Sequence, residues 1–436
     1  MKLNNKYQFL IVIFLSAFAL QAQQTLSIED AIKIALKNNY EIQIASNNLK
    51  VDSENNTAGN AGMLPIVTAS IIDNNNIQNL SQTRSDGTVN SLNNGKSNSL
   101  NYGIGLDWTI FDGMKMFARR DQLKELQKLG ESQLKWTIIT KIGDVYSTYY
   151  DIVQQQQQLV ALDSTIIISL QRLDLAQNRF TIGKASKLEV LNAQVDLNTD
   201  KVLQLKQKVI ISNTKVLLNQ ILARDATIDF TTNNIFKVDT SLKLEDLSSL
   251  AKKQNPELQA QIINKKITEL QLKQVKSSRY PTVAVRSGYN FVDTQSSLGF
   301  TTQSSAKGLN YGFSASLNLF DGLAQNRNEK IANLALDNAN IQIDQQELAL
   351  ETQLTMAYQT YLTNLELITL EETNESIAKK NLEITLDKFR IGTITTLEFR
   401  TAQLNYVNAI VRFTNAQYQA KLSEISLKEL SGRLDY

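Results

Sequence analysis

The sequence carries the same series of short motifs twice, in the same order. Asn39-Tyr40-Glu41-Ile42 recurs 216 residues later as Asn255-Pro256-Glu257-Leu258. Later motifs recur at a constant separation of 209 residues: Asn101-Tyr102-Gly103 with Asn310-Tyr311-Gly312, Phe111-Asp112-Gly113 with Phe320-Asp321-Gly322, Ile182-Gly183 with Ile391-Gly392, Leu188-Glu189 with Leu397-Glu398, and Ala193-Gln194 with Ala402-Gln403. Self-similarity at a fixed separation indicates an internal duplication. We therefore expect the two halves of the chain to fold into the same order of elements.

The separation between the repeated motifs changes at one place only. It is still 216 residues at Leu64-Pro65 and Tyr280-Pro281, and it is 209 from Asn101 onward. Loops absorb insertions far more readily than packed helices do. The segment between Pro65 and Asn101 is therefore expected to contain a loop of variable length.

Each half is predicted to begin with a helix and to continue into strands. Residues 28–59 and 244–276 have helical patterns, and the prolines that follow suit the first residue of a strand, where no amide donor is needed. Apolar residues then alternate with polar or small ones, which is the pattern of a strand with two different faces. The apolar faces hold Leu100, Tyr102, Ile104, Leu106, Trp108 and Ile110 in the first half, and Val283, Val285, Tyr289, Phe291, Leu309, Tyr311, Phe313, Ala315, Leu317 and Leu319 in the second.

The same alternation occurs in soluble β-sandwiches, so it does not by itself indicate a membrane protein. Here, however, glycine and polar residues occupy the face that would form a sandwich core, and two hairpins make a marginal sheet on their own. These features favour strands that share a larger barrel closed by oligomerisation. The polar residues 73–99 and 293–307 are predicted to be hydrophilic loops at the mouth of that barrel.

A very long helix is predicted in each half. Residues 114–180 contain no proline, and as one helix they would be ~100 Å long. Alternating spacings of four and three residues predict a coiled-coil seam at Ile138, Ile142, Val145, Tyr149, Ile152, Gln156, Leu159, Asp163, Ile166, Leu170, Leu173, Gln177 and Phe180. The second half repeats the seam at Leu354, Tyr358, Tyr361, Leu365, Ile368, Leu382, Leu386 and Phe389. The glutamines at 154–158 are interpreted as a solvated helix face.

Both long helices are predicted to end at a glycine, Gly183 or Gly392, with a new helical pattern within four residues. Glycine there permits the left-handed backbone of a helix C-cap. Such a turn can be purely structural. The alternative is that the end of a long helical hairpin displayed in solvent is a docking surface for another protein.

The composition excludes several classes of enzyme. Histidine and cysteine are both absent, which removes Ser-His-Asp and Cys-His catalytic arrangements, thiolate zinc sites and disulfide frameworks. The composition still allows a carboxylate-only site or a Ser-Lys dyad, but no convergent polar site is visible in the sequence. We therefore expect no enzymatic activity, no cofactor and no metal site.

The N-terminus has the features of a secretory signal peptide. Lys2 and Lys6 precede an almost wholly apolar stretch at 9–20, and Ala22 offers a cleavage point. An uncleaved anchor is the alternative, although the apolar stretch is short for a membrane helix. The predicted organisation is a signal peptide at 1–22, a first repeat at 23–223, a linker at 224–241 and a second repeat at 242–436.

The rest of the chain is close to electrically neutral. It has 45 basic and 43 acidic residues in all, and two of the basic ones lie in the signal segment. Nucleic acid is therefore not an expected partner. No later stretch is apolar over 18 residues, so a membrane crossing by the mature chain would have to use strands.

These motifs together resemble the TolC family of outer-membrane efflux proteins, over essentially the whole mature chain. The resemblance depends on the opening segment at 26–39, on the paired strand ends at 108–113 and 317–322, and on the paired tips at 179–183 and 388–392. It implies a mainly α fold with a small membrane β-barrel. Duplicated helical hairpins would form a trimeric α-barrel, continued by a twelve-stranded β-barrel with four strands from each chain.

The resemblance also implies partners and a location. The chain would be a homotrimer in the outer membrane of a Gram-negative bacterium, in contact with its lipid, with a long periplasmic extension. The tips would contact a periplasmic adaptor protein that connects to an inner-membrane pump. The residues that match the adaptor-contacting turns are Ile182, Gly183, Lys184, Ile391, Gly392 and Thr393.

Glu189 and Glu398 match acidic positions of the family at the constricted entrance. Three copies of two carboxylates would form a ring that favours cations. Alternatively, both glutamates simply lie in the first turn of a return helix, where the helix dipole favours acids. The family's tyrosine and arginine latch positions are occupied by Phe389 and Ile394, and a second aspartate position by Thr401, so the closed state is expected to depend on other contacts.

The expected function is passive conduction of substrates through the outer membrane in a tripartite efflux system. A type I protein secretion outlet uses the same fold and is the alternative within this class. A periplasmic coiled-coil scaffold without a pore is the alternative from another class, and the alternating strands argue against it. The sequence does not identify the transported substrate.

Overall fold

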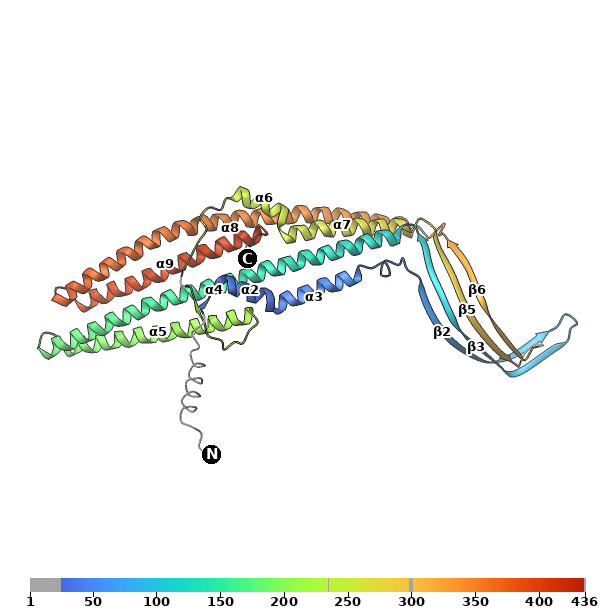
Figure 1. Cartoon of the computed structure of the whole chain (residues 1–436), viewed down its shortest axis with the longest axis horizontal. Coiled ribbons are helices and arrows are strands. Elements are labelled where there is room, and N and C mark those ends of the chain that lie inside the picture. Colours follow the sequence, from blue (N-terminus) through green and yellow to red (C-terminus); the bar gives the residue numbers. More distant parts are fainter. Residues whose placement is uncertain (1–24, 234, 298–300, 435–436) are drawn as a thin grey trace, which may run out of the picture. The chain divides into compact units, whose positions relative to one another are not determined.

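The computed structural model describes residues 25–233, 235–297 and 301–434, so the predicted signal peptide at 1–22 lies outside the described residues. The chain divides into two compact units. The hairpin unit contains residues up to 47 together with 132–259 and 345–436. The sheet unit contains residues 48–131 and 260–344. Each is described separately below, with element labels as in Figure 1.

The two halves of the chain have the same order of elements, as the duplication predicts. The first half contains α2 (Ile28–Asn38), α3 (Tyr40–Asn55), β2 (Ile66–Thr83), β3 (Val89–Asp112), α4 (Lys115–Thr181) and α5 (Lys187–Ile221). The second half contains α6 (Leu244–Gln254), α7 (Pro256–Ser277), β5 (Thr282–Ser296), β6 (Gln303–Ser316), α8 (Ala324–Ile391) and α9 (Thr396–Leu430). Two short strands, β1 (Thr25–Leu26) and β4 (Thr231–Thr232), pair in parallel. The helix predicted at 114–180 is thus confirmed as α4.

The helices predicted at 28–59 and 244–276 are each broken in two by an asparagine. Asn39 and Asn255 have extended backbone ψ values of 127° and 120°. The Asn39 side-chain oxygen accepts hydrogen bonds from the amides of Glu41 and Ile42, and Asn255 does the same for Leu258. Each asparagine therefore caps a new helix, which the helical pattern alone did not predict.

The sheet unit contains an antiparallel sheet of four strands in the order β2-β3-β5-β6. Successive strands pair in register, for example Ile104 with Tyr289 and Tyr289 with Leu309. One face is apolar over much of its length in all four strands, interrupted by Ser287 between Leu106 and Tyr311. On this face Tyr102 stacks on Phe291 with ring centroids 4.8 Å apart. The alternation of faces is therefore confirmed, except that β6 ends at Ser316 and does not reach Leu317 or Leu319.

The prediction that residues 73–99 and 293–307 are loops is wrong for most of their length. The β2–β3 ladder continues through the asparagine-rich residues to the pair Thr83 and Val89, and β5 pairs with β6 as far as Gln295 and Gln303. Backbone hydrogen bonds hold a ladder whatever the side chains are. The polar side chains also pair across strands, since Asn98 donates to both Asp73 and Asn75.

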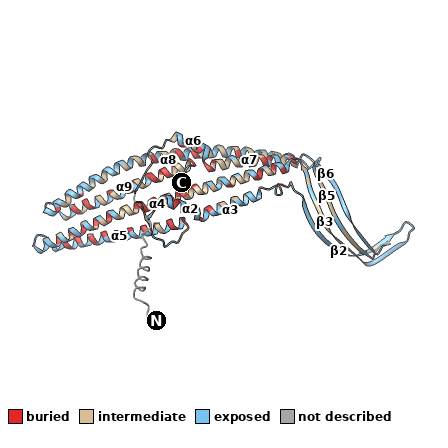
Figure 2. Cartoon of the chain, viewed as in Figure 1, coloured by how far each residue is buried: buried red, intermediate tan, exposed pale blue. Residues whose placement is uncertain are grey.

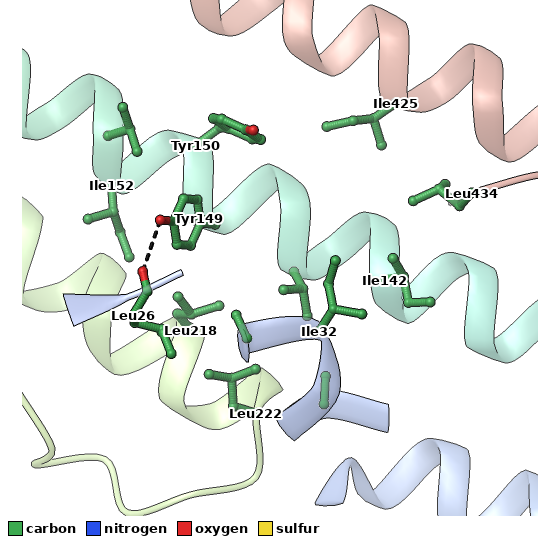
Figure 3. Close-up of a cluster of buried hydrophobic side chains, with 14 of the residues drawn as sticks. Leu26, Ile32, Ile142, Tyr149, Tyr150, Ile152, Leu218, Leu222, Ile425 and Leu434 are labelled. Carbon is green, nitrogen blue, oxygen red and sulfur yellow. Dashed lines mark hydrogen bonds between the residues drawn. The ribbon is translucent and has the colours of Figure 1, made fainter. Parts of the chain in front are cut away.

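The largest apolar core of the hairpin unit lies where α2, α4, the ends of α5 and α9, and strand β1 meet (Figure 3). Ile142, Tyr149 and Ile152 of α4 are almost completely buried there. The Tyr149 hydroxyl donates to the Leu26 carbonyl at 2.9 Å and accepts from the Asn233 amide at 3.1 Å. This core anchors the first described residues and the connection after α5 to the middle of α4.

The predicted seam of α4 is correct only as far as Ile152. Farther along α4, Leu170 and Gln177 are exposed, and the buried positions after the glutamines are Ala161, Leu162, Thr165, Ser169, Arg172 and Ala176. The glutamines at 154–158 are not a solvated face either. Gln154 is buried, and the run bonds to α9, α5 and β4 through Asn415, Gln207, Thr232 and Thr414. The buried seam of α4 therefore lies on a different face of the helix after the polar layer formed by these glutamines.

Burial differs sharply between the long helices and the strands (Figure 2). Buried residues follow one side of the long helices, whereas most strand residues are exposed, including Ile71, Tyr311 and Phe313 at 73%, 82% and 81%. Among the described residues, no helix combines the length and the apolar character that a membrane crossing requires.

Candidate functional site

The two long hairpins of the hairpin unit turn at the predicted glycines. Gly183 and Gly392 have left-handed backbones, with φ of 76° and 82°. The Lys184 amide donates to the Arg179 carbonyl, and the Thr393 amide donates to the Lys388 carbonyl, so both turns have the same 6→1 closing bond. The predicted contact residues Ile182 and Ile391, which precede the glycines, are 66% and 75% exposed.

The return helices α5 and α9 begin with capped first turns. Ser186 and Thr395 accept hydrogen bonds from the amides of Glu189 and Glu398. The Glu398 carboxylate also accepts from the Thr395 amide, which completes a capping box. Both predicted gate glutamates therefore lie in the first turn of a helix.

Glu189 and Glu398 make different contacts. Glu398 bonds only within its own turn, to the amide and hydroxyl of Thr395. Glu189 reaches the other hairpin, where the Thr396 hydroxyl donates to it at 3.2 Å, and it also lies 3.7 Å from the Arg179 guanidinium. The acidic side chain of the first tip thus connects the two tips within one chain.

A groove of about 590 Å³ lies between the starts of α5 and α9. Its lining mixes charged, polar and apolar side chains: Arg172, Arg179, Ser186, Leu188, Glu189, Asn192, Val195, Asp196, Ile394, Thr395, Thr396, Leu397 and Arg400. Within the described residues, no three acidic side chains come together as a metal site would require.

The residues at the family's latch positions are part of an apolar cluster. Phe389 is 1% exposed and stacks on Phe399, with ring centroids 5.1 Å apart. Ile394 packs against this cluster, whose members come from α8 and α9 and from Ile168 and Leu175 of α4. Thr401, at the second aspartate position, bonds only to the Leu397 carbonyl of its own helix.

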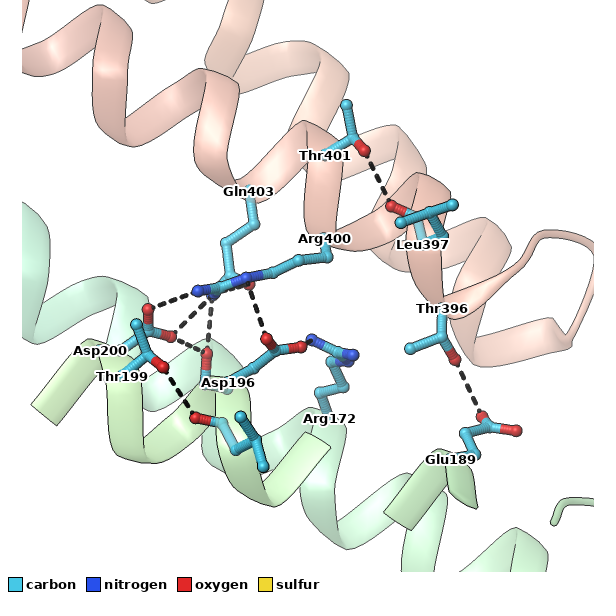
Figure 4. Close-up of polar contacts among 12 residues, drawn as sticks. Arg172, Glu189, Asp196, Thr199, Asp200, Thr396, Leu397, Arg400, Thr401 and Gln403 are labelled. Carbon is cyan, nitrogen blue, oxygen red and sulfur yellow. Dashed lines mark hydrogen bonds and ion pairs between the residues drawn. The ribbon is translucent and has the colours of Figure 1, made fainter. Parts of the chain in front are cut away.

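A buried polar network, which the sequence reasoning did not predict, lies beside this cluster (Figure 4). Arg400 of α9 donates to both carboxylate oxygens of Asp200 in α5, each at 2.9 Å. Arg172 of α4 donates to Asp196 at 2.6 Å, and Asp196 also lies 3.7 Å from Arg400. Three helices from both hairpins are thus joined through two guanidiniums and two carboxylates.

Two neutral side chains complete the network. Ser169 of α4 donates to Asp200 at 2.6 Å, and Gln403 of α9 donates to Ser169 at 2.8 Å. Gln403 and Ser169 are 0% and 1% exposed, and the Asp200 side chain is 2% exposed. A signal for part of this network was present in the sequence, because Asp200 falls on the same heptad seam of α5 as the buried Ala193 and Leu197.

The family model and the curated relative found by comparison with known proteins are both of outer-membrane proteins. The family model described as "Outer membrane efflux protein" matches residues 31–224 and 247–433. The curated "Outer membrane protein TolC" of Escherichia coli K12 is 21% identical over 353 residues, which covers 78% of this chain and 70% of that protein.

Solved structures resemble the chain in fold. The outer-membrane channel OprN matches with a TM-score of 0.76 and 15% identity, over 93% of this chain and 89% of that one. The CmeC outer membrane channel of Campylobacter jejuni matches with a TM-score of 0.76 and 17% identity, over 93% and 85% of the two chains.

Proposed function

This chain belongs to the outer membrane efflux protein family, and we propose that three copies of it form the outer-membrane channel of a tripartite efflux system. It is a channel and not an enzyme. In this proposal each repeat, 23–223 and 242–436, contributes one β-hairpin and one long helical hairpin, and residues 224–241 connect them. The helical hairpins extend into the periplasm, and the channel conducts substrates passively while an inner-membrane pump supplies the energy.

The observation that carries the proposal is the pair of open edges of the four-stranded sheet. Within the part of the chain that the structure describes, strands β2 and β6 have a partner on one side only, although they are 18 and 14 residues long. Long open edges with exposed apolar side chains promote uncontrolled association unless they are paired. Because all four strands alternate in direction, β6 of one copy can pair antiparallel with β2 of the next. Repetition of this pairing closes a barrel.

The two faces of the sheet suit such a barrel. The apolar face, with Tyr102, Ile104 and Phe313, would contact lipid. The opposite face carries Gly103, Gly105 and the ion pair between Arg286 and Asp107, which would line a water-filled interior. An eight-stranded barrel from two copies would be filled by its own side chains. Three copies, giving twelve strands, are the smallest number that leaves a conduit.

The hairpin unit independently supports association with further copies. Besides its buried seam, α5 has a second heptad series that the described part of the chain leaves about half exposed: Leu188, Leu191, Val195, Val202, Leu205, Val209 and Val216, each between 44% and 64% exposed. A helix with two apolar seams packs against neighbours on both sides. A neighbouring copy in a closed ring would supply the second neighbour.

The tips are proposed to bind a periplasmic adaptor protein. Ile182, Gly183 and Lys184 form one turn, and Ile391, Gly392 and Thr393 form the other. Their exposed apolar side chains, next to the groove between α5 and α9, support a role in docking another protein. Glu189 and Glu398 are proposed to line the entrance and to favour cations.

The test is the mass and conductance of the purified full-length protein. We expect a trimer in detergent by native mass spectrometry, and discrete ion-conducting events when the trimer is added to a planar lipid bilayer. A water-soluble protein without conductance would contradict the channel and would favour a scaffold. For the adaptor, Ile182→Asp with Ile391→Asp should abolish cross-linking to adaptor in cells, whereas Tyr40→Asp, equally exposed but distant in sequence from both tips, should not.

A further inference from the structure

The turn between each β-hairpin and its long helix contains two successive left-handed residues. These are Gly113 and Met114 in the first repeat, with φ of 69° and 71°, and Gly322 and Leu323 in the second, both with φ of 66°. Glycine adopts this backbone freely, but a residue with a side chain is strained in it. The Met114 and Leu323 side chains are also 60% and 63% exposed. An apolar medium around these side chains would offset both the strain and the exposure.

Further exposed apolar side chains lie at this junction, where the sheet meets the ends of α4, α7 and α8 (Figure 1). Together with Met114 and Leu323 they form an apolar belt, whose other members are Phe117, Tyr280, Leu319 and Phe320, each between 52% and 90% exposed. The segments that carry them are in contact. An added Cβ at Gly113 would come within 2.8 Å of the Tyr280 Cβ, and Gln325 of α8 donates to the Val275 carbonyl of α7 at 2.7 Å.

Basic residues are concentrated beside the apolar belt. The segments at 112–124, 273–280 and 321–330 include nine basic and four acidic residues, whereas the whole chain has a formal net charge of only +2. Gln274 of the second segment donates to Gln122 of the first at 2.9 Å, so these segments also lie side by side. The positive charge is therefore a local property of the junction.

Three of these basic side chains are available to bind an anion. Lys115, Arg327 and Lys330 are exposed, and within the described residues none of them forms an ion pair. Two of the acidic groups, Asp112 and Asp321, accept hydrogen bonds from amides at the starts of α4 and α8. Cations next to an exposed apolar surface are typical of a site that binds the phosphate of an anionic lipid and contacts its acyl chains.

We propose that this junction binds anionic phospholipids of the periplasmic leaflet of the membrane. The apolar belt contacts their acyl chains, and Lys115, Arg327 and Lys330 bind their phosphate groups. The inference rests on the proposed function, since it requires the sheet to be embedded in a membrane. Because the helices of this outer-membrane channel extend into the periplasm, the end of the sheet next to them faces the periplasmic leaflet. A free phosphate ion would pair with the cations but would leave the apolar belt in water.

The phosphate site is tested by native mass spectrometry of the full-length protein in a neutral detergent. Phosphatidylglycerol and phosphatidylcholine with the same acyl chains are the probes. We expect phosphatidylglycerol adducts at a lipid concentration about tenfold lower than that needed for phosphatidylcholine adducts. Equal binding of the two lipids would overturn the proposal.

Two triple variants separate the junction from the general effect of charge. The first is Lys115→Gln with Arg327→Gln and Lys330→Gln, and it should lose the preference for phosphatidylglycerol. The matched control removes the same charge from exposed positions of α5 and should keep the preference: Lys201→Gln with Lys206→Gln and Lys208→Gln. A junction variant that keeps the full preference would overturn the assigned phosphate site.

The apolar belt is tested by fluorescence quenching in phosphatidylglycerol vesicles. The chain has no cysteine, so Leu323→Cys supplies a single site for an environment-sensitive label. A lipid with a nitroxide group on its acyl chain should quench about half or more of the emission at this site. Leu334→Cys is the matched control. Leu334 is equally exposed, at 62%, but lies about 15 Å beyond the start of α8, so its label should stay unquenched.

A label within the sheet distinguishes this inference from the proposed channel. Tyr311→Cys lies in β6, where Tyr311 is 82% exposed. Quenching at 311 without quenching at 323 would overturn the lipid contact of the junction and leave the channel intact. Quenching at neither position would mean that the sheet lies outside the membrane, and both proposals would then be wrong.

Discussion

Phe180 and Phe389 occupy the same position in the two repeats, 209 residues apart, yet Phe389 is 1% exposed and Phe180 is 37% exposed. The partner of Phe389 is Phe399, and the equivalent residue in the first repeat is the smaller Val190. Phe180 instead lies beneath the ammonium group of Lys187, at 5.3 Å. The two tips thus have similar turns but different side-chain packing beneath them.

This asymmetry predicts unequal effects of the same substitution. Phe389→Ala removes a fully buried ring and should lower the local free energy of unfolding of the second tip by about 3–5 kcal/mol. Phe180→Ala should cost only about 1–2 kcal/mol, since 37% of the Phe180 surface is already in water. Native-state hydrogen exchange of the tip amides measures both. Equal effects would mean that Phe180 becomes buried in the assembled protein.

Asn255→Ala is predicted to destabilise the junction between α6 and α7. Asn255 is completely buried, caps α7 and donates to the Leu430 carbonyl at the end of α9. The substitution removes a helix cap and leaves the partly buried Leu430 carbonyl without this donor, which together cost about 2–4 kcal/mol.

The control for this prediction is Gln254→Ala, whose side chain is exposed and adjacent in sequence. Thermal denaturation of the two variants in detergent should separate them clearly. A melting temperature of Asn255→Ala equal to that of the control would show that water replaces the lost bonds at no cost.

Features that depend on local sequence patterns could be predicted from the sequence alone. Gly183 and Gly392 marked the two turns because the left-handed backbone there favours glycine. Alternation of apolar and polar residues identified the faces of three of the four strands, β3, β5 and β6. Helix length followed from the absence of proline between the strands and the tips.

Features that depend on tertiary contacts were missed. Asn39 looks like a tolerable helix residue until its bond to the Ile221 carbonyl, 182 residues away, is known. The asparagines at 74–76 favour loops, but the ladder beside them imposes a strand. Ser169 and Arg172 lie outside the predicted seam although both are buried. A polar layer shifts the buried face of α4, and a heptad pattern read from the sequence does not predict such a shift.

Glu429 should make the stability of the hairpin unit depend on pH. Its side chain is packed against the backbone of Gly143, where a Cβ would overlap the carboxylate, and burial followed by the nearby charge of Asp144 raises its pKa to about 7. The other charged groups on the facing helix are accounted for, since Lys141 is paired with Asp144 and Glu41.

The folded chain therefore holds a proton that the unfolded chain releases near the ordinary pKa of 4.5. Stability contributed by this group is present below pH 4.5 and is lost as the pH rises to about 7. Glu429→Gln should remove this loss, so that the difference in melting temperature between pH 5 and pH 8 becomes smaller. Glu372→Gln, on an exposed face of α8, is the control and should leave the difference unchanged.

The proposed ring of carboxylates at the entrance predicts a loss of cation preference in one double variant. Glu189→Gln with Glu398→Gln removes two charges per copy, or six from a trimer. The folds of the tips should survive, because glutamine at the position of Glu398 can still complete the capping box with Thr395. The ratio of cation to anion permeability, measured from the reversal potential across a planar bilayer with a salt gradient, should fall toward one.

The double variant Glu366→Gln with Glu372→Gln removes the same charge from exposed positions away from the tips and should keep the original ratio. An unchanged cation preference in the tip variant would contradict the proposed carboxylate ring. Glu189 would then serve only to bond to Thr396, and Glu398 only to cap its helix.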